Sequence, residues 1–502
     1  PWSTSFSAVD IRAATVAARR SVLPSRRIRT MTRAVPQPSE TPSFWATVRE
    51  AVRGTEQELT SVPIKRAVLL LAVPMVLEMS MESLFAIVDI FFVSRLGSDA
   101  VATVGLTESM LSLIYALAMG LSAGATALVS RKAGAKDLDG AATAAGQVIL
   151  VALACATVLG IVGVALSSHL LGAMGAAPSV VATGSGYTAI MLGGSVTIFL
   201  LFVVNAIFRS AGDAAVAMRS LWLANGLNIA LAPCFIFGLG PFPRMGVAGA
   251  AVATTLSRGA GVGYQLLALR RGRGRLVLRP HHLKPRPQII RELLKLSGAA
   301  SLQVLIETAS WLGLVRILSA YGSIALAGYT IAMRVAIFAL LPSWGLANAA
   351  ATLVGQNLGA GEPERAKRSV TTIARYNVVF LGVVGLLFAL APHLVVSPFT
   401  TDALVEAYGS DCLRIVALGF VVFAYGMVMV QAFNGAGDTV TPMLVNLACF
   451  WFFKIPIAYV LANGLGLGPR GVFISITAAY AVQAVVSSTL FRRGRWQTKQ
   501  IG

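Results

Sequence analysis

Long apolar stretches recur along the chain, and short polar turns separate them. A membrane-spanning helix needs about 20 mostly apolar residues. Several of the stretches are longer than a bilayer core requires, which predicts tilted helices or protruding ends. The pattern therefore predicts an all-α polytopic membrane protein. Its twelve candidate spans have approximate edges at 64–94, 100–130, 141–167, 180–208, 213–238, 246–269, 291–320, 325–357, 370–391, 408–433, 439–462 and 471–491.

The composition agrees with this class. Of the 502 residues, 56% are hydrophobic and 12% are charged, whereas a soluble globular domain has about 25% charged residues. A chain so poor in charge is suited to a bilayer rather than to water.

The two halves of the chain share a sequence pattern. The segment RSAGDAAVAM at 209–218 resembles NGAGDTVTPM at 434–443, and both follow an apolar stretch. Asp213 and Asp438 in these segments lie 225 positions apart (438 − 213 = 225). Each can cap the helix that follows, where a carboxylate opposes the partial positive charge of the N-terminus. The turns thus indicate a duplicated architecture rather than a reaction.

The same shift aligns other parts of the halves without gaps. It places Gly120 on Gly345, Glu82 on Glu307, and Gly246-Val247 on Gly471-Val472. One register that holds across several helices predicts two six-helix lobes. Since each half has an even number of helices, the lobes form a parallel repeat about an axis along the membrane normal. The predicted regions are an N-terminal extension, a first lobe, a basic cytoplasmic linker and a second lobe, at 1–60, 61–276, 277–286 and 287–502.

The net charge of +20 is distributed unevenly. Cytoplasmic loops of membrane proteins are rich in Lys and Arg, so this distribution predicts that both termini are cytoplasmic and argues against nucleic acid as a partner. The loops on the opposite side hold at most one arginine each (Arg95, Arg244, Arg470). Cations gather in alternate loops, in the central linker and after the last span, for example Arg131, Lys132, Lys136, Arg270, Arg271, Arg279, Lys284, Arg286, Arg365, Lys367, Arg368, Arg492 and Arg493.

Residues 1–39 are rich in Arg and Ser and contain one acid, Asp10, which is typical of an organellar transit peptide. The alternative is untranslated sequence upstream of a start at Met31, since residue 1 is Pro. A transit peptide would direct the protein to a plastid or another organellar envelope; otherwise a plasma or inner membrane is expected. In both cases we expect residues 1–39 to be disordered or removed, and dispensable for transport.

The first span holds three acids, Glu78, Glu82 and Asp89. At 100° per residue they share one helical stripe, which must face the protein interior or a cavity because ionisable groups at membrane depth are costly. A carboxylate in such surroundings can take up and release protons near neutral pH. The alternative for Glu78 or Glu82 is a buried acid paired with a neighbouring helix. Pro74 in the same span favours a bend and is the predicted hinge.

Other polar groups lie inside the predicted spans. Asn225 and Asn228 provide neutral hydrogen-bonding groups in the fifth span. In the seventh span, Gln303 and Glu307 are the repeat equivalents of Glu78 and Glu82. Glu108 is a weaker candidate. The cations Arg316, Arg334 and Lys454 are expected to pair with carboxylates or to extend towards the membrane surface.

The sequence lacks the motifs that several kinds of chemistry require. No lysine is followed by Ser or Thr, so there is no Walker A phosphate loop. The four histidines, which include His281 and His282 in the linker, show no metal-ligand spacing. We therefore expect neither catalysis nor a cofactor or metal. We expect transport to be driven by a gradient of H⁺, Na⁺ or the substrate itself.

Several motifs in their order along the chain resemble the multidrug and toxic compound extrusion (MATE) transporters. They are LAVPMVLEM, VDIFFVSRLGSDAVATVGL, ALVSRKAGAKD, FRSAGD, NIALAP, GVAGAAVAT and NGAGDTVTPM, and the resemblance covers about residues 61–495. It implies an antiporter that exports small organic, often cationic, compounds in exchange for H⁺ or Na⁺. The expected partners are this substrate and the lipid bilayer, with the protein acting as a monomer.

The resemblance implies different ion sites in two branches of that family. In the DinF-like branch, Pro74 and Asp89 match the first helix and Asn228 matches the fifth, but Ala232 stands where an Asp is usual. In the NorM-like branch, Glu307 matches, but the tenth-helix Asp is absent. The DinF-like branch is favoured, with Asp89 as the main proton site and Glu82 or Glu307 compensating for Ala232.

Other functions remain open. A lipid-linked oligosaccharide flippase would share this architecture, although its cavity should hold cations for a diphosphate. An exporter of an organic anion such as citrate is a further alternative. A channel is disfavoured because duplicated lobes suit alternating access.

Overall fold

A computed structural model describes residues 43–54, 58–272 and 274–501. The predictions for residues 1–39 lie outside these ranges. Every regular element in the described ranges is helical. In the first half these are α1 Phe44–Arg53, α2 Ile64–Ser94, α3 Ser98–Gly134, α4 Leu138–Ala173, α5 Pro178–Gly193, α6 Ser195–Ala211, α7 Ala214–Phe237 and α8 Val247–Arg271.

The linker contains the short 3₁₀ helix η1, and the second half repeats the order of the first. Its short elements are α12 Pro392–Val396, η2 Ser397–Phe399 and η5 Arg495–Thr498, and η1 spans Pro280–Leu283. Its longer elements are α9 Pro287–Ser319, α10 Ser323–Gly359, α11 Pro363–Leu390, α13 Ala403–Leu418, α14 Phe420–Ala436, α15 Val440–Asn446, η3 Leu447–Lys454, α16 Ile455–Tyr459, η4 Val460–Gly464 and α17 Pro469–Arg492.

The helices account for the twelve predicted spans. Ten described segments are long and apolar enough to cross a membrane, and the pair α13 and α14 makes an eleventh if it counts as one span. The twelfth, α8, has 25 residues but falls short in hydropathy. The polar side chains of Arg258 and Gln265 lower its mean hydropathy, and both are buried.

The fourth and tenth predicted spans are each interrupted. Gly194 separates α5 from α6, and Gly419 separates α13 from α14 with a bend of 54°. A Cβ atom at Gly194 would lie 2.7 Å from the Thr255 hydroxyl, and one at Gly419 would lie 2.8 Å from the Thr477 methyl group. The break thus brings the last helix of each lobe close to the backbone of the fourth span.

The repeat register is exact over most of the chain. Helices α3 and α10 begin 225 positions apart (323 − 98) and end 225 apart (359 − 134). It changes at the last helix of each lobe, where the glycines that precede α8 and α17, Gly246 and Gly468, both have φ 57°. These are 222 apart, so Gly246 corresponds to Gly468 and not to Gly471. The loop before α17 is shorter than the one before α8, which accounts for the shift.

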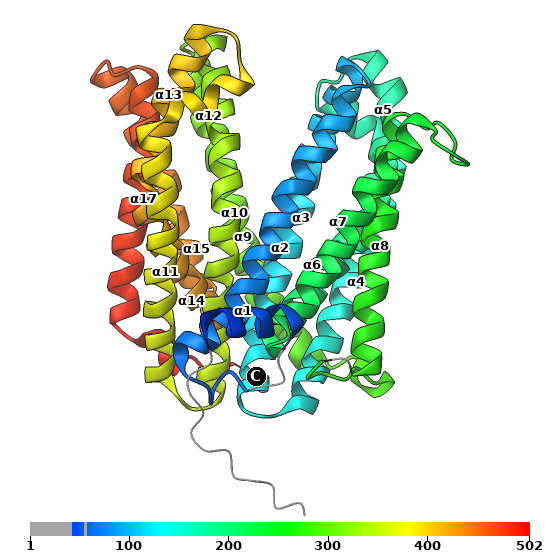
Figure 1. Cartoon of the computed structure of the whole chain (residues 1–502), viewed down its shortest axis with the longest axis vertical. Helices are drawn as coiled ribbons and strands as arrows, with labels where there is room; N and C mark the ends of the chain where they lie inside the picture. Colours follow the sequence, from blue (N-terminus) through cyan, green and yellow to red (C-terminus); the bar gives the residue numbers. More distant parts are fainter. Residues whose placement is uncertain (1–42, 55–57, 273, 502) are drawn as a thin grey trace, which may run out of the picture. The chain divides into compact units, whose positions relative to one another are not determined.

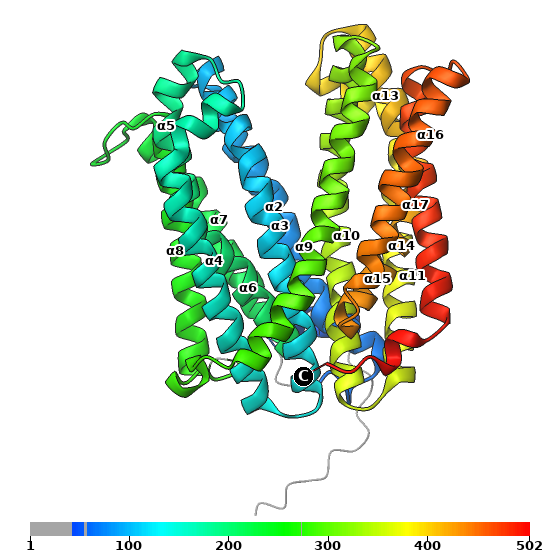
Figure 2. The same ribbon diagram turned by 180° about the vertical axis from the view of Figure 1, so that it is seen from behind.

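The lobes lie together at one end and diverge towards the other (Figures 1 and 2). The diverging end is opposite α1 and the C-terminus. Between the lobes, α2 packs along α10 and α3 along α9. Two repeat-equivalent glycines make these contacts close: a Cβ at Gly120 would lie 2.0 Å from the Ser301 hydroxyl, and one at Gly345 would lie 2.5 Å from the Met75 carbonyl oxygen.

The first helix of each lobe begins in the core of the other lobe. Val68, Leu71 and Met75 of α2 share a core with residues of α10 and α14, such as Leu353 and Phe433. In α9 the early residues Leu293 and Leu296 belong instead to the core of the first lobe. Helix α2 is continuous through Pro74, which lies where this helix passes from one core to the other.

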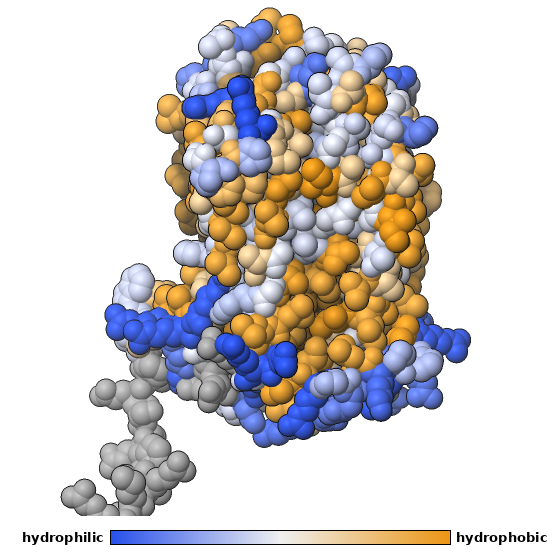
Figure 3. Space-filling model, turned by 90° about the vertical axis from the view of Figure 1, so that its right-hand side faces the viewer, coloured by the Kyte–Doolittle hydropathy of each residue, from blue (hydrophilic) through white to orange (hydrophobic). Residues whose placement is uncertain are grey.

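Residues 43–60, assigned to the extension from the sequence, include α1, which packs on α2 and α7. The folded unit therefore starts at Ser43. The face formed by the first lobe has a broad apolar band between hydrophilic ends (Figure 3). This is the surface that a bilayer requires.

Candidate substrate and ion-coupling site

Glu78 is held in an ion pair. Its carboxylate lies 2.6 Å from Nη1 of Arg209 on α6 and accepts a hydrogen bond of 3.0 Å from the Asn205 amide. Glu78 is only 1% exposed. A buried charge without a partner is strongly unfavourable, so Arg209 explains how this acid is tolerated. The structure thus places Glu78 in the paired arrangement that was the sequence-based alternative.

Glu82 and Asp89 face the inside of the first lobe from the diverging half of α2. Glu82 accepts a hydrogen bond of 3.0 Å from the Asn225 amide on α7. Asp89 is half-buried, and its Oδ1 atom is buried without a hydrogen-bond partner among the described residues. It interacts electrostatically with Glu108 of α3 and Arg258 of α8. Asp89 is therefore the acid of the stripe whose hydrogen-bonding capacity is least used.

Arg258 is the central residue that the sequence analysis missed. It is 7% exposed, and its Nη1 atom donates to the Tyr115 hydroxyl at 3.1 Å. Its guanidinium lies 5.9 Å from the ring centres of both Phe85 and Tyr115, and it interacts electrostatically with Glu82 as well as Asp89. The signal was a lone arginine inside the predicted span 246–269, since a cation at that depth marks a functional region.

Asn228 lies beside the site without touching its acids. Its side-chain amide donates to the Thr254 hydroxyl at 2.9 Å, which ties α7 to α8. Ala232, one turn further along α7, is buried. The fifth helix therefore adds no carboxylate at this position.

The second lobe has its own acid and cation. Glu307 on α9 accepts a hydrogen bond of 3.3 Å from the Tyr480 hydroxyl and interacts electrostatically with Lys454. Lys454 is fully buried in the π-helical segment η3, and its ammonium group donates to the Ser310 hydroxyl at 2.6 Å. It also lies 4.6 Å from the ring centres of Trp311 and Phe450. Lys454 thus contacts a hydroxyl and two aromatic rings directly, and its interaction with Glu307 is a longer-range electrostatic one.

Gln303 lies one turn before Glu307 and is 8% exposed. Its Oε1 atom has no hydrogen-bond partner among the described residues, so the group is free to accept a hydrogen bond from a ligand. Arg334 of α10 interacts electrostatically with Glu108 of the opposite lobe. This pair places charge from both lobes at the space between their diverging halves.

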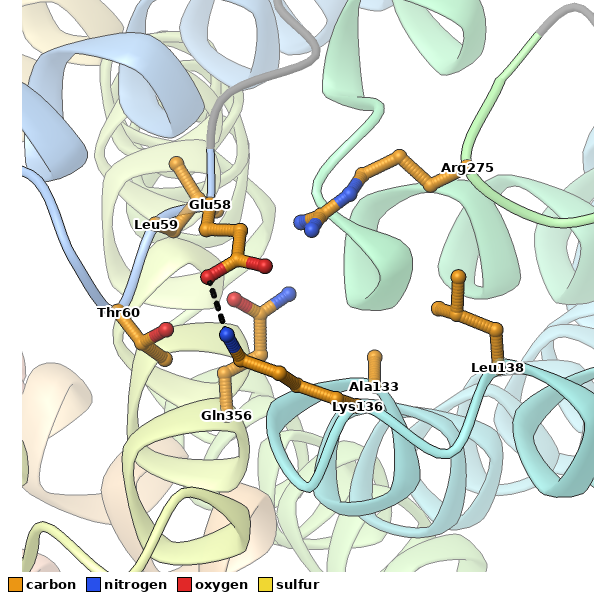
Figure 4. Close-up of a pocket in the computed structure, with 8 residues that line it drawn as sticks. All are labelled: Glu58, Leu59, Thr60, Ala133, Lys136, Leu138, Arg275 and Gln356. Carbon is orange, nitrogen blue, oxygen red and sulfur yellow. Dashed lines mark ion pairs between the residues drawn. The ribbon is translucent and has the colours of Figure 1, made fainter. Parts of the chain in front are cut away.

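The other end of the lobes is closed by hydrogen bonds that follow the repeat. Gln356 of α10 donates to the Ser210 carbonyl oxygen of the first lobe at 2.7 Å. Arg131, its repeat equivalent on α3, donates to the Ala436 carbonyl oxygen of the second lobe at 3.2 Å. Beside Gln356, Glu58 forms an ion pair of 3.0 Å with Lys136 across a small pocket (Figure 4). The two Ala-Gly-Asp turns are thus part of the contact between lobes.

The predicted helix capping by Asp213 and Asp438 is wrong. Neither side chain caps the helix that follows. Asp213 accepts the backbone amide hydrogen of Arg275 at 2.6 Å, and Asp438 lies 3.4 Å from the ammonium group of Lys499. Each aspartate therefore contacts the chain segment that leaves the last helix of its lobe, and Asp438 also accepts a hydrogen bond of 2.7 Å from the Thr441 hydroxyl.

The linker histidines meet an acid that is distant in sequence. Asp139, His281 and His282 place their ligand atoms within 4.8 Å of one another. Nδ1 of His282 accepts the backbone amide hydrogen of Arg279 at 3.1 Å, so Nε2 carries the hydrogen that faces Asp139 at 2.9 Å. A nitrogen that carries a hydrogen has no free lone pair for a metal. The cluster fits an anchor for the linker, supported by Gln147, which donates to the His282 carbonyl oxygen.

These features define a multi-pass membrane protein of two six-helix lobes, with buried ionisable groups on the diverging halves. The sequence model of the MatE family matches residues 74–234 and again residues 299–460. The two matches begin 225 positions apart (299 − 74 = 225), as the repeat predicts. The chain belongs to the MatE family of transporters.

Related proteins of known structure or description cover most of the chain. It is 25% identical over 449 residues to a probable multidrug resistance protein, YoeA, of Bacillus subtilis (strain 168), which covers 89% of this chain and 97% of that protein. It is 27% identical over 444 residues to a probable multidrug resistance protein, NorM, of Thermotoga maritima, with 87% and 94% covered. A crystal structure of MATE in complex with MaL6 superimposes with a TM-score of 0.82 at 27% identity, covering 87% of this chain and 97% of that one.

Proposed function

We propose that this transporter exports small organic cations in exchange for protons, by alternating access of the site on the diverging halves of the lobes. Asp89 carries the proposal, because it is a half-buried carboxylate with an oxygen that no described group satisfies. Such a group can bind either a proton or a cationic substrate. Competition of the two for one carboxylate produces exchange.

The charges of the first lobe favour a cation. Glu82 and Asp89 interact there with the buried guanidinium of Arg258 and Glu108 interacts with Arg334 of the opposite lobe, while Glu78 is already paired with Arg209. Three carboxylates against two cations leave the site with one net negative charge when all are ionised. Protonation of Asp89 removes one charge and lowers the cost of closing the lobes around it.

The same geometry supports protons over sodium and disfavours the flippase alternative. A bound metal cation needs several oxygen ligands, and Ala232, which stands where the resemblance leads one to expect an Asp, offers no side-chain oxygen. A diphosphate needs unpaired cations, whereas Arg258 and Lys454 each face a carboxylate. This supports the DinF-like arrangement of the site, and the distribution of arginine and lysine supports termini in the cytoplasm, or in the stroma for a plastid protein. With that orientation, the lobes diverge towards the outside.

Transport by purified protein in liposomes tests this proposal. Ethidium and citrate serve as cationic and anionic probes, each under a proton gradient or a sodium gradient imposed separately. We expect the proton gradient to drive ethidium transport, the sodium gradient to drive none, and citrate not to move. Sodium-driven ethidium transport would overturn the choice of ion, and citrate transport would overturn the choice of substrate class.

A further inference from the structure

An apolar groove opens between the lobes on the outer surface, away from the site described above. Its volume is about 350 Å³. Leu69 and Val76 of α2 form one wall, Leu346 of α10 the floor, and Tyr376 and Phe380 of α11 the other wall. Phe44 of α1 closes the end nearest the termini. These four helices lie on the side of the molecule that faces the viewer in Figure 1.

Helix α1 fixes the depth of this groove in the membrane. One face of α1 is buried through Thr47 and Ala51, while Phe44 and Trp45 are exposed. An amphipathic helix of this kind lies in the plane of the membrane interface, and Trp residues mark the level of the lipid headgroups. The groove therefore lies in the leaflet on the side of the termini, with its lower end at headgroup level.

The walls of the groove end in cations at that level. Lys65 lies one turn before Leu69 on α2, and Arg368 lies two turns before Tyr376 on α11; both are exposed. Neither forms an ion pair with another described residue. Between residues 363 and 376, α11 has one acid, Glu364, against the cations Arg365, Lys367, Arg368 and Arg375. The rim is therefore basic, which disfavours an organic cation as occupant.

We propose that this groove binds an anionic phospholipid of the leaflet on the side of the termini. Its acyl tail lies in the apolar groove between α2 and α11, and its headgroup contacts Lys65 and Arg368. The acyl tail fills the groove and packs against its apolar walls. Each basic group adds an electrostatic attraction to the anionic headgroup. Because α2 and α11 start in different repeats, a bound lipid touches both and favours the arrangement in which the lobes are together at this end.

On the opposite side of the molecule, the residues equivalent by the repeat are packed differently. The repeat equivalent of Val76 is Ser301 (76 + 225 = 301), whose backbone and hydroxyl lie against Gly120. Among the described residues, no helix equivalent to α1 precedes α9. The repeat therefore does not reproduce the lining of this groove on the other side.

Native mass spectrometry of the full-length protein tests the proposal by counting retained lipids. The protein is released from nanodiscs that contain phosphatidylglycerol and phosphatidylcholine in equal amounts. The double variant Lys65→Gln/Arg368→Gln is compared with Arg270→Gln/Arg271→Gln, which removes two exposed cations at the end of α8. Leu346→Trp fills the groove, and Leu386→Trp is its control on an exposed part of α11.

We expect the wild type to retain one phosphatidylglycerol in preference to phosphatidylcholine. Loss of each rim cation should weaken that preference about fivefold, Leu346→Trp should abolish retention, and both controls should behave as wild type. Equal effects of groove and control variants would show only general surrounding lipid and would overturn the proposal. Lipid retention that appears only after deletion of residues 1–42 would mean that this segment occupies the groove in the full-length protein, and would overturn the proposal. The surface-charge variants need no change of core packing, so the test does not depend on Leu346→Trp folding.

Discussion

Paired charges explain most of the ionisable residues at membrane depth. Glu78 forms an ion pair with Arg209, while Asp89 and Glu307 interact electrostatically with Arg258 and Lys454 without a direct ion pair among the described residues. The helical stripe of acids on α2 could be predicted because residue spacing alone fixes the face of a helix. The partners could not, since they come from helices whose packing the sequence does not specify. Arg209, for example, opens the turn segment 209–218 in the sequence, but in the structure it lies in the last turn of α6 and reaches Glu78.

The Arg258–Asp89 pairing makes a prediction about stability. Arg258→Gln removes the cation that Glu82 and Asp89 face and the donor to Tyr115, which typically costs about 1–3 kcal/mol. We expect a clear fall in the melting temperature of the detergent-purified protein, with partial recovery in Arg258→Lys, which keeps the charge but not the planar fork. Arg316→Gln, on the exposed surface of α9, is the control and should have little effect.

The double variant Arg258→Gln/Asp89→Asn separates pairing from other roles of the arginine. If the two groups interact, removing both should restore part of the melting temperature lost in Arg258→Gln. Additive losses in the double variant would contradict the pairing.

At the level of elements, the sequence predicted where the spans lie but not their interruptions. Apolar length identifies 180–208 and 408–433 as single spans, and hydropathy does not register the breaks at Gly194 and Gly419. These breaks depend on the approach of threonines from other helices. The gap-free register likewise failed at Gly246, because loop lengths differ between the halves. Close contacts and loop lengths are properties of the packed structure.

The repeat-equivalent glycines at the lobe contact give a prediction for this scale. In Gly120→Ala and Gly345→Ala, the added methyl group would meet the backbone or side chain of the opposing helix. Overpacking of this kind costs about 1–3 kcal/mol and should weaken the contact that holds the lobes together near the termini. We expect spin labels at Ser98→Cys and Ser323→Cys, on the diverging ends, to show an added population at shorter distance.

Gly105→Ala on α3 is the matched control, because no atom lies within 4 Å of the added Cβ. Identical distance distributions in the wild type and in all three alanine variants would show that these glycines do not set the lobe arrangement.

For the whole molecule, the duplicated two-lobe architecture was predictable because one offset relates many positions. The exchange of helix ends was not: α2 starts in the core of the second lobe and α9 in the core of the first. Hydrophobic patterns show that a face is buried, not which helix covers it. This exchange makes α2 and Pro74 the link through which a change in one lobe reaches the other. Glu82 and Asp89, the proposed coupling residues on α2, lie just beyond that link.

Charge distribution predicts the orientation of the whole molecule. In a background without the native cysteines, Lys284→Cys should react only with reagent on the cytoplasmic (or stromal) side, and Pro243→Cys only with reagent on the other side. Both positions are exposed. Labelling of Lys284→Cys from outside would contradict the orientation and reverse the direction of transport proposed above.

The central claim is that Asp89 exchanges a proton for substrate, and proton movement measures it most directly. Proteoliposomes with a pH-sensitive dye inside receive ethidium without an imposed gradient, so any pH change reports exchange. Asp89→Asn resembles the protonated state with little change in volume. Asp213→Asn and Asp438→Asn alter aspartates that hold chain segments far from the site. We predict a substrate-dependent pH change in the wild type and in these two controls, and none in a folded, membrane-inserted Asp89→Asn. A full pH change in Asp89→Asn would contradict the account and move the coupling site to Glu82 or Glu307.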